Sequence, residues 1–260
     1  MICAALLVLL SSGGDEGRIF NEINRWRAEM HLPACKINTN LTQAAKEHAA
    51  YMRVNKTVSH FESQSSPGFT AVAPWDRAQK AGYKGICFEG GSDDADPIKG
   101  LRSQFAGPYH RMPYMQPGSP EIGIGIDGRY ISVDIGISQQ EGVSFSPVDG
   151  QKDVPTTWDG FDAPPPLVAY GQKTPAGYPI VFGYFTRFVS PIKVFSMKLT
   201  KDGVEVPCYF NSPATDQNLK NTGFLVSKKP LSSKTTYRVE VKAADPKGIA
   251  LERTWSFTTN

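Results

Sequence analysis

Hydrophobic residues recur at helical spacing along the first part of the chain and predict four helices. The first covers residues 15–32, where apolar positions three and four apart are followed by a proline that ends the helix. The same spacing predicts a helix over 41–54, capped by Asn40, and a short helix over 70–82. A fourth helix begins at Asp96-Pro97, where a capping residue precedes a proline in the first turn.

The pattern changes to strict alternation after these helices and predicts a β-hairpin. Isoleucine alternates with glycine over 122–126, the pair Asp127-Gly128 follows, and residues 129–137 alternate again. An Asp-Gly pair between two alternating runs is typical of a tight hairpin turn. Because the glycines leave one face of the first strand without side chains, we expect another element to pack closely against that face.

From about residue 145 onward the helical spacing is lost, and short runs of β-forming residues alternate with turn residues. Lys201-Asp202-Gly203 separates two of these runs as a hairpin turn. The candidate strands are residues 178–185, 192–199, 204–210, 223–226, 237–241 and 254–257. Short strands at nearly regular spacing predict an all-β sandwich over 145–260, next to a mixed domain over 15–140.

Composition and charge narrow the functional classes. The 260 residues suit two domains, and 40% hydrophobic with 20% charged residues is ordinary for globular proteins. The net charge is only +3 and the basic residues are interleaved with acids, so we expect no nucleic-acid partner. Residues 1–14 resemble a secretory signal without its positive start, so we expect a signal segment whose start is truncated or misassigned. A buried strand is the alternative. The apolar run is too short to span a bilayer, and we expect no transmembrane segment.

Several anchors in 15–140 resemble the CAP superfamily of cysteine-rich secretory, antigen 5 and pathogenesis-related proteins, in its bacterial form. The segment FAGPYHRMPYMQPGSPEIGIGI over 105–126 is similar to the family's SPGHR…IGxG stretch, and Asn24, Arg27 and Leu32-Pro33 resemble its first helix. In the second domain, PLSSKTTYRVEV and the terminal WSFTT resemble the end of bacterial Ig-like domains. The fold class expected is therefore α+β, an N-terminal α/β/α sandwich CAP domain followed by a C-terminal all-β Ig-like sandwich.

The CAP resemblance implies a cavity lined by histidine and glutamate. His60 matches the family's first cavity histidine, Glu89 its glutamate in the GEN segment, and His110 its second histidine. The segment departs from GEN, because Phe88 and Gly90 replace the flanking residues, and the helix after Asp96 lacks the second cavity glutamate. Glu62 is a candidate substitute at the rim of the cleft, and we expect Tyr109 or Arg111 beside His110. The remaining polar residues of interest are interpreted as structural: His48 as a packed core residue, and Asp76 with Arg77 as a pair at a helix start.

The cavity chemistry leaves two functional classes open. Two histidines and a glutamate can hold Zn²⁺ with one open position, and Glu89 would then act as the base of a metal-dependent hydrolase. The same residues can instead form a polar cavity without metal, satisfied by water. We favour a secreted, periplasmic or cell-surface binding module without enzymatic activity, whose partner is a small lipid-like or other ligand or a cell-surface component. The Ig-like domain would serve it as a spacer or adhesion domain.

The cysteines leave one pairing open. With Cys3 set aside in the signal segment, Cys35, Cys87 and Cys208 remain, so at most one bridge can form. Cys35 and Cys87 fall in the same predicted domain and are the candidate pair in an exported protein, with Cys208 free or buried. Two buried reduced thiols are the alternative, because spacing in the sequence does not show that two Cα atoms approach each other.

Overall fold

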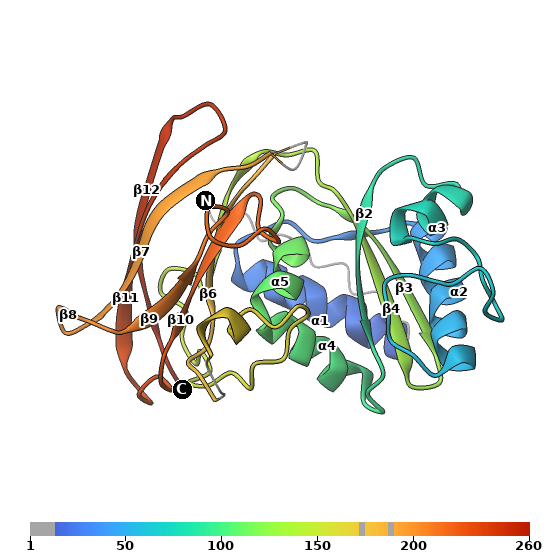
Figure 1. Cartoon of the computed structure of the whole chain (residues 1–260), viewed down its shortest axis with the longest axis horizontal. Coiled ribbons are helices and arrows are strands. Elements are labelled where there is room, and N and C mark those ends of the chain that lie inside the picture. Colours follow the sequence, from blue (N-terminus) through green and yellow to red (C-terminus); the bar gives the residue numbers. More distant parts are fainter. Residues whose placement is uncertain (1–13, 172–174, 187–189) are drawn as a thin grey trace, which may run out of the picture. The chain divides into compact units, whose positions relative to one another are not determined.

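A computed structural model describes residues 14–171, 175–186 and 190–260 (Figure 1), so the predicted signal segment and Cys3 lie outside the described residues except for Gly14. Its contacts divide the chain into two compact units. We call the first the N-terminal unit, which comprises the chain up to residue 102 together with 118–137. The second, the β-rich unit, comprises 103–117 and 138–260. The predicted domain boundaries stay a prediction.

The helices of the N-terminal unit follow the predicted spacing, with shifted ends. They are α1 (Asp15–Glu29), α2 (Thr39–Asn55), α3 (Pro74–Lys80) and the start of α4 (Pro97–Ala106). Helix α2 is capped by Asn38 rather than by Asn40, because the side chain of Asn38 accepts hydrogen bonds from the backbone N–H groups of Asn40 (2.9 Å) and Leu41 (3.2 Å). The predicted first helix is three residues too long, since His31 has a left-handed φ of 57°.

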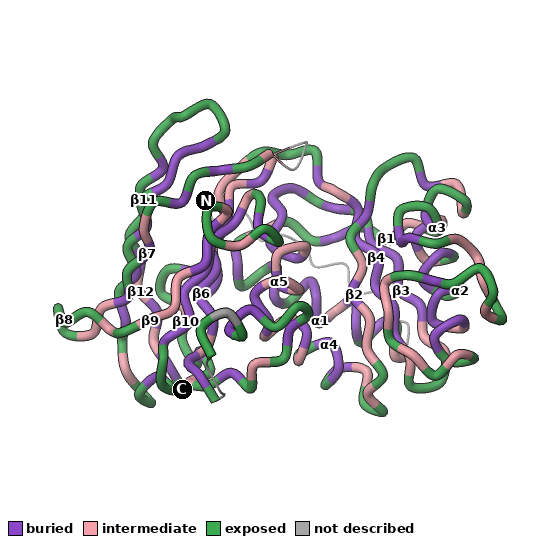
Figure 2. Tube along the Cα trace, in the orientation of Figure 1, coloured by how far each residue is buried: buried purple, intermediate pink, exposed green. Residues whose placement is uncertain are grey.

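A four-stranded sheet forms the middle layer of the N-terminal unit. Its order is β1 (Lys36–Ile37), β3 (Glu121–Asp127), β4 (Tyr130–Gly136) and β2 (Cys87–Ser92), with β1 parallel to β3 and the other pairs antiparallel. A Cβ atom on Gly123 or Gly125 would overlap the backbone of α2, which confirms the predicted close approach. Helices α2 and α3 lie on one side of the sheet and α1 on the other (Figure 1), so the unit is an α/β/α sandwich. Figure 2 shows β3 and β4 buried along most of their length.

The β-rich unit is an all-β sandwich that also contains two short helical segments near residue 110. One sheet has the order β5-β6-β10-β9 and the other β12-β11-β7-β8. The elements are α5 (Pro108–Arg111), η1 (Met112–Met115), β5 (Gly142–Ser146), η2 (Val168–Tyr170), β6 (Ile180–Phe185), β7 (Lys193–Lys201), β8 (Val204–Glu205), β9 (Cys208–Asn211), β10 (Thr222–Ser227), β11 (Thr236–Ala244) and β12 (Ala250–Thr258). The described part of 175–260 contains strands and no helix, as the alternating pattern predicts.

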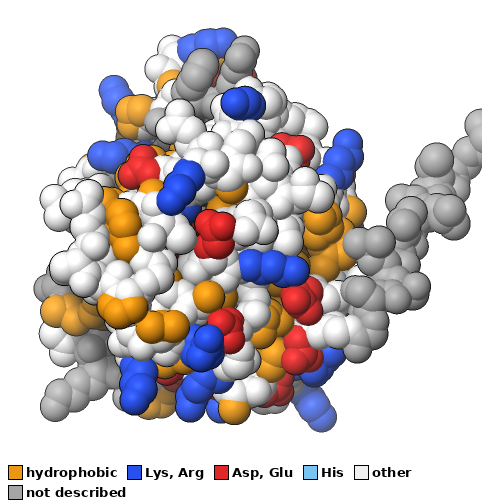
Figure 3. All heavy atoms as spheres, turned by 90° about the vertical axis from the view of Figure 1, so that its right-hand side faces the viewer, with side chains coloured by type: hydrophobic (Ala, Val, Ile, Leu, Met, Phe, Trp, Pro, Cys, Tyr) orange, Lys and Arg blue, Asp and Glu red, His pale blue; other side chains and the backbone are white. Residues whose placement is uncertain are grey.

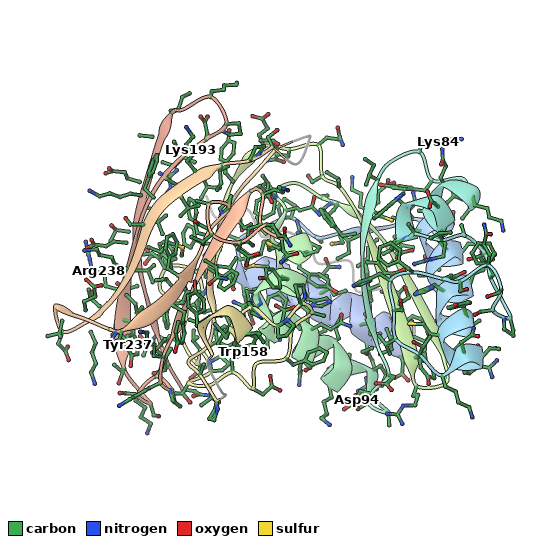
Figure 4. All side chains as sticks on the ribbon, in the orientation of Figure 1. Lys84, Asp94, Trp158, Lys193, Tyr237 and Arg238 are labelled. Carbon is green, nitrogen blue, oxygen red and sulfur yellow. The ribbon has the colours of Figure 1, made fainter. Side chains whose placement is uncertain are left out.

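Side chains from both sheets meet in one apolar core. Phe182 of β6 and Val239 of β11 are fully buried members of this core. Tyr237 and Arg238 are consecutive in β11 and differ as the strand period requires, Tyr237 being buried and Arg238 exposed (Figure 4). The turn between β7 and β8 has left-handed φ at Gly203, which confirms the predicted hairpin. The Ig-like resemblance of this sandwich stays a prediction.

The predicted pair of cysteines is wrong in this structure. Cys35, Cys87 and Cys208 are free thiols, and the first two are buried. Cys35 directly precedes Lys36 of the edge strand β1, which pairs with Glu121 of β3, while Cys87 lies in the opposite edge strand β2 and pairs with Gly136 of β4. Three strand spacings, about 14 Å in total, separate the edges, whereas a disulfide needs Cα atoms within about 7 Å. Sequence spacing does not reveal that the strand order places the two thiols at opposite edges.

Basic and acidic side chains are mixed on the surface, as they are along the sequence. Figure 3 views the molecule from the side of α2 and α3 and shows basic and acidic side chains interspersed with hydrophobic ones. Across residues 14–171, 175–186 and 190–260, no helix combines the length and the apolar character needed to cross a bilayer.

Candidate functional site

A cluster of polar side chains is built on the face of the sheet that α2 covers. Asp134 of β4 is paired with Gly123 on one side and with Glu89 of β2 on the other. Directly paired residues project to the same face of a sheet, and the face at Gly123 is the one on which α2 lies. The carboxyl groups of Glu89 and Asp134 therefore lie next to each other beneath α2.

Glu89 is the centre of this cluster. His60 contacts its Oε1 through Nδ1 at 3.0 Å, and His48 lies 3.5 Å from the same oxygen. The other oxygen, Oε2, accepts hydrogen bonds from Arg77 and, at 3.5 Å, from Ser132. Burial would raise the pKa of Glu89, but the hydrogen bond from His60 and the charges of His48 and Arg77 outweigh it and hold this pKa below its usual value. Glu89 is therefore a fixed buried anion.

Arg77 of α3 donates hydrogen bonds to several groups of the cluster. Its side chain is fully buried, and its guanidinium donates to the backbone carbonyls of His60 (3.2 Å) and Val72 (3.3 Å) as well as to Glu89. The predicted structural pair with Asp76 is wrong, because Asp76 accepts a hydrogen bond from the N–H of Ala73 (3.3 Å) at the start of α3. Consecutive residues of a helix point about 100° apart, so Asp76 and Arg77 reach different partners although they are adjacent in the sequence.

His48 and Glu62 form a fully buried pair within the cluster. His48 Nδ1 lies 2.8 Å from Glu62 Oε1, and both side chains are fully buried. Glu62 Oε2 accepts hydrogen bonds from the N–H (2.6 Å) and the hydroxyl (3.0 Å) of Thr70. Burial would raise the pKa of Glu62, but the hydrogen bonds from His48 and Thr70 hold it below its usual value. Glu62 therefore does not lie at a solvent-open rim, where the sequence placed it.

The hydrogen bonds of His48 determine its charge. Nε2 lies 2.8 Å from the carbonyl oxygen of Ser59, and Nδ1 faces the carboxylate of Glu62. A carbonyl and an ionised carboxylate only accept hydrogen bonds, so both ring nitrogens must donate. His48 is therefore an imidazolium, and the cluster contains two buried cations, His48 and Arg77, beside two buried anions, Glu62 and Glu89.

Asp134 is the one acidic residue of the cluster that stays neutral. Its side chain is fully buried, and among the described residues neither carboxyl oxygen has a hydrogen-bond partner. Burial and the adjacent Glu89 carboxylate raise the pKa of Asp134 well above its usual value. A protonated Asp134 leaves the charges of the cluster balanced.

His110 lies in α5 and is held by a carboxylate of the β-rich unit. Its Nδ1 is 2.5 Å from Oδ1 of Asp162, a buried residue of the loop before η2. The neighbouring Tyr109 packs edge-on against the ring of Phe224, at 5.7 Å between ring centres, and its hydroxyl donates to Asp216. Burial and that carboxylate raise the pKa of Tyr109.

Arg111 was expected beside His110 at the cavity and instead anchors α5 in the β-rich unit. Its guanidinium is fully buried, donates to the carbonyl oxygens of Phe105 and Pro179 at 2.8 Å, and lies 4.3 Å from the ring centre of Tyr178. Adjacent residues of a helix point about 100° apart, so Arg111 and His110 reach different partners within the β-rich unit.

The cluster around Glu89 contains some of the predicted site residues and also residues that were not predicted to belong to the site. His60 and Glu89 are in contact, and His48, Arg77 and Asp134 join them although the sequence analysis gave none of the three a role in the site. Asp134 carries a signal that was available, because it is an acid in the middle of an alternating apolar strand. The other two carry no local signal, since their partners are distant in the chain.

The donor set around Glu89 does not favour a divalent cation. One oxygen of Glu89 is occupied by the guanidinium of Arg77, and a cation at that carboxylate would be repelled by two buried positive groups. Within the described part of the chain, no three histidine, cysteine, aspartate or glutamate side chains are grouped to hold a metal ion. A zinc site made of His60, Glu89 and His110 stays a prediction.

Comparison with known proteins finds one family model that matches part of the chain. Residues 20–129 match the model of the cysteine-rich secretory protein family, CAP. No curated protein matches the chain.

Similar solved structures include two bacterial surface or extracellular proteins. An extracellular protein containing an SCP domain from Bacillus anthracis is 21% identical, with a TM-score of 0.40 over 46% of this chain and 39% of that protein. An outer surface protein from Borrelia burgdorferi is 20% identical, with a TM-score of 0.40 over 47% of this chain and 91% of that protein. PcoC, a copper resistance protein from Escherichia coli, is 15% identical, with a TM-score of 0.28 over 45% of this chain and 95% of that protein. The chain thus spans well under half the length of the Bacillus protein.

Proposed function

We propose that the chain is an extracellular or cell-surface binding protein whose CAP domain recognises a small amphipathic ligand through His60. The observation that carries this proposal is the arrangement around His60, whose side chain is 42% exposed while its partners Glu89 and Arg77 are buried. A charge-balanced, internally hydrogen-bonded cluster holds one imidazole in a defined position at the surface. Such a preorganised polar group is suited to fixing the orientation of a bound molecule.

The state of Glu89 argues for binding and against hydrolysis. A general base works best when its pKa lies near the operating pH. Glu89 has a lowered pKa and shares its oxygens with Arg77 and His60, so it is a weak base at neutral pH. The hydrolase alternative, with Glu89 as base and a metal held by His60 and His110, is therefore the less supported of the two functions.

Exposed aromatic rings next to His60 indicate the apolar part of the ligand. Phe61 follows His60 in the chain and is 56% exposed, and Trp75 at the start of α3 is 48% exposed. The two rings meet edge to face with 6.4 Å between their centres. Aromatic groups left in water beside a fixed polar group are typical of a ligand-contacting surface. A molecule with an acyl chain or ring for Phe61 and Trp75 and an anionic head for His60 fits this surface.

The fluorescence of Trp75 provides the test. The other three tryptophans of the chain, Trp26, Trp158 and Trp255, are buried, so acrylamide quenching reports mainly on Trp75. With palmitate as the probe, we expect bound ligand to reduce the quenching. Loss of a hydrogen bond to a charged group is worth about 1.5–3 kcal/mol, so His60→Ala should weaken palmitate binding about tenfold or more.

Matched controls separate recognition from general hydrophobic adsorption. His31→Asn changes an exposed histidine of the same unit, and Phe195→Ala removes an exposed aromatic side chain of the β-rich unit. Both variants should bind palmitate like the wild type. The proposal fails if palmitate leaves the quenching of Trp75 unchanged, or if His60→Ala behaves like these controls.

A further inference from the structure

A long loop of the N-terminal unit carries most of the ligand surface proposed above. Residues 56–73 join α2 to α3 (Figure 1) and contain no helix or strand. His60 and Phe61 lie in the first part of this loop, and Val72 lies near its end, shortly before Trp75 of α3. A loop of this length without secondary structure is uncommon in a compact domain and is usually functional or disordered. The side chains that fasten it therefore decide whether it presents a defined surface.

Glu62 ties the two ends of this loop to each other. Its backbone N–H donates to the carbonyl oxygen of Val72 at 2.9 Å. In its side chain, Oε2 accepts hydrogen bonds from the N–H (2.6 Å) and the hydroxyl (3.0 Å) of Thr70. The side chain is fully buried, and its Oε1 lies 2.8 Å from Nδ1 of His48. One residue thus connects the first part of the loop with its last part and with α2.

These hydrogen bonds set the positions of three exposed apolar side chains. Glu62 directly follows Phe61 and is bonded to Val72, so the backbone segments that carry these two side chains are held side by side. The ring of Phe61 meets that of Trp75 edge to face, with 6.4 Å between their centres. We call Phe61, Val72 and Trp75 the apolar strip, and its members are between 44% and 56% exposed. The strip offers the acyl chain of an amphipathic ligand several contacts at once.

Arg77 holds the same backbone segments at other points. Its guanidinium donates to the carbonyl oxygens of His60 (3.2 Å) and Val72 (3.3 Å). These contacts involve backbone atoms and stay available when the side chain of Glu62 is removed. Loss of the Glu62 carboxylate should therefore release Thr70 and the loop around it while the loop remains attached to α3.

We propose that Glu62 is a positioning residue for the ligand surface, which holds the apolar strip in one arrangement before a ligand binds. A binding loop that is already ordered does not lose conformational freedom on binding, and this raises its affinity. The proposal rests on the proposed function in one respect, namely that the strip contacts the acyl chain. The order of the loop itself is measured without any ligand.

Glu62→Ala tests the proposal in the full-length protein. Without ligand, amide hydrogen exchange followed by NMR should become faster at Thr70 and also at position 62, whose N–H is bonded to Val72. Acrylamide should quench Trp75 more strongly, because the ring of Phe61 is no longer held against it. At a temperature where the variant is folded, palmitate should bind about tenfold or more weakly, because the loop must then be ordered on binding.

Glu62→Gln separates positioning from stability. Its amide oxygen can accept both hydrogen bonds from Thr70, while its amide nitrogen faces Nδ1 of His48, an atom that is able to accept. The loop then stays fastened although the carboxylate is gone. We expect a lower melting temperature but exchange at Thr70 and palmitate affinity close to those of the wild type. Ser65→Ala is the matched control in the same loop, because its exposed hydroxyl contacts only that of Ser63 among the printed bonds, and it should change none of these quantities.

Faster exchange and weaker binding in Glu62→Ala, with neither in Glu62→Gln or Ser65→Ala, support the proposal. Unchanged exchange at position 62 in Glu62→Ala, or wild-type palmitate affinity in that variant, would overturn it, as would affinities that simply follow the melting temperatures of the variants. If Glu62→Ala does not fold, Thr70→Val removes one of the two donors to Glu62 and should give smaller changes of the same sign, and no change there would also overturn the proposal. If the loop loosens as expected but palmitate does not bind the wild type, the positioning of the loop stands and the proposed ligand class fails.

Discussion

Arg77 offers the strongest test of how the buried cluster is held together. Its side chain and that of Glu89 are 0% and 1% exposed, so each compensates the charge of the other out of contact with water. Arg77→Met removes the guanidinium and leaves the Glu89 carboxylate and the carbonyl oxygen of His60 without these donors. Breaking a buried ion pair by removing one partner costs about 3–5 kcal/mol.

This cost translates into a large effect on unfolding. At about 3 °C per kcal/mol, the melting temperature of the N-terminal unit should fall by about 10–15 °C. Urea unfolding at pH 7, followed by tryptophan fluorescence with hydrogen exchange to assign the transition to this unit, gives the free energy directly. Adding Glu89→Gln to Arg77→Met removes the stranded charge, and the coupling between the two changes should be about 2–3 kcal/mol.

An exposed ion pair of the same unit provides the control. Arg53 and Asp127 are 2.6 Å apart with side chains 52% and 31% exposed, so Arg53→Met should cost less than about 1 kcal/mol. If Arg77→Met costs no more than Arg53→Met, the cluster is not a compensated ionic network. Additive effects of Arg77→Met and Glu89→Gln would refute the pairing itself.

Three further predictions follow from other parts of the structure. The hydrogen bond from Arg25 outweighs burial and lowers the pKa of Glu22 to about 2. The ionised Glu22 therefore stabilises the folded state above the unfolded pKa of 4.5, and this stabilisation is lost as the pH falls through about 2. Glu22→Gln should therefore lower the melting temperature at pH 7 but not at pH 2, and equal losses at both would count against the ion pair. Mass spectrometry of a non-reduced digest should find no Cys35–Cys87 bridge. Burial raises the pKa of Cys35 to about 11, so alkylation of this thiol should be slow until the protein is unfolded. Gly125→Ala should destabilise the N-terminal unit by about 3 kcal/mol or more, because the overlapped atoms belong to the backbone of α2, and a loss below about 1 kcal/mol in urea unfolding would show that α2 can move away.

Local patterns in the sequence determined the elements that carry the site. The spacing of apolar residues predicts α1 and α2 to within a few residues, and the alternation around Asp127-Gly128 predicts the hairpin of β3 and β4. The bare glycine face of β3 predicts that another element lies against it, and α2 does. These features depend on residues close together in the chain, so their physical causes can be read from the sequence without the fold.

The partners of the site residues were decided only by the tertiary structure. Glu89 meets Arg77 and His60, 12 and 29 residues away, and it meets Asp134 because of the register between β2 and β4. The strand order likewise separates Cys35 from Cys87. Such contacts depend on how strands align and on which helix covers which face, and shifting a strand by a single residue would turn Glu89 to the other side of the sheet. The residue types were visible in the sequence, but their charges and hydrogen bonds arise from neighbours that only the folded chain brings together.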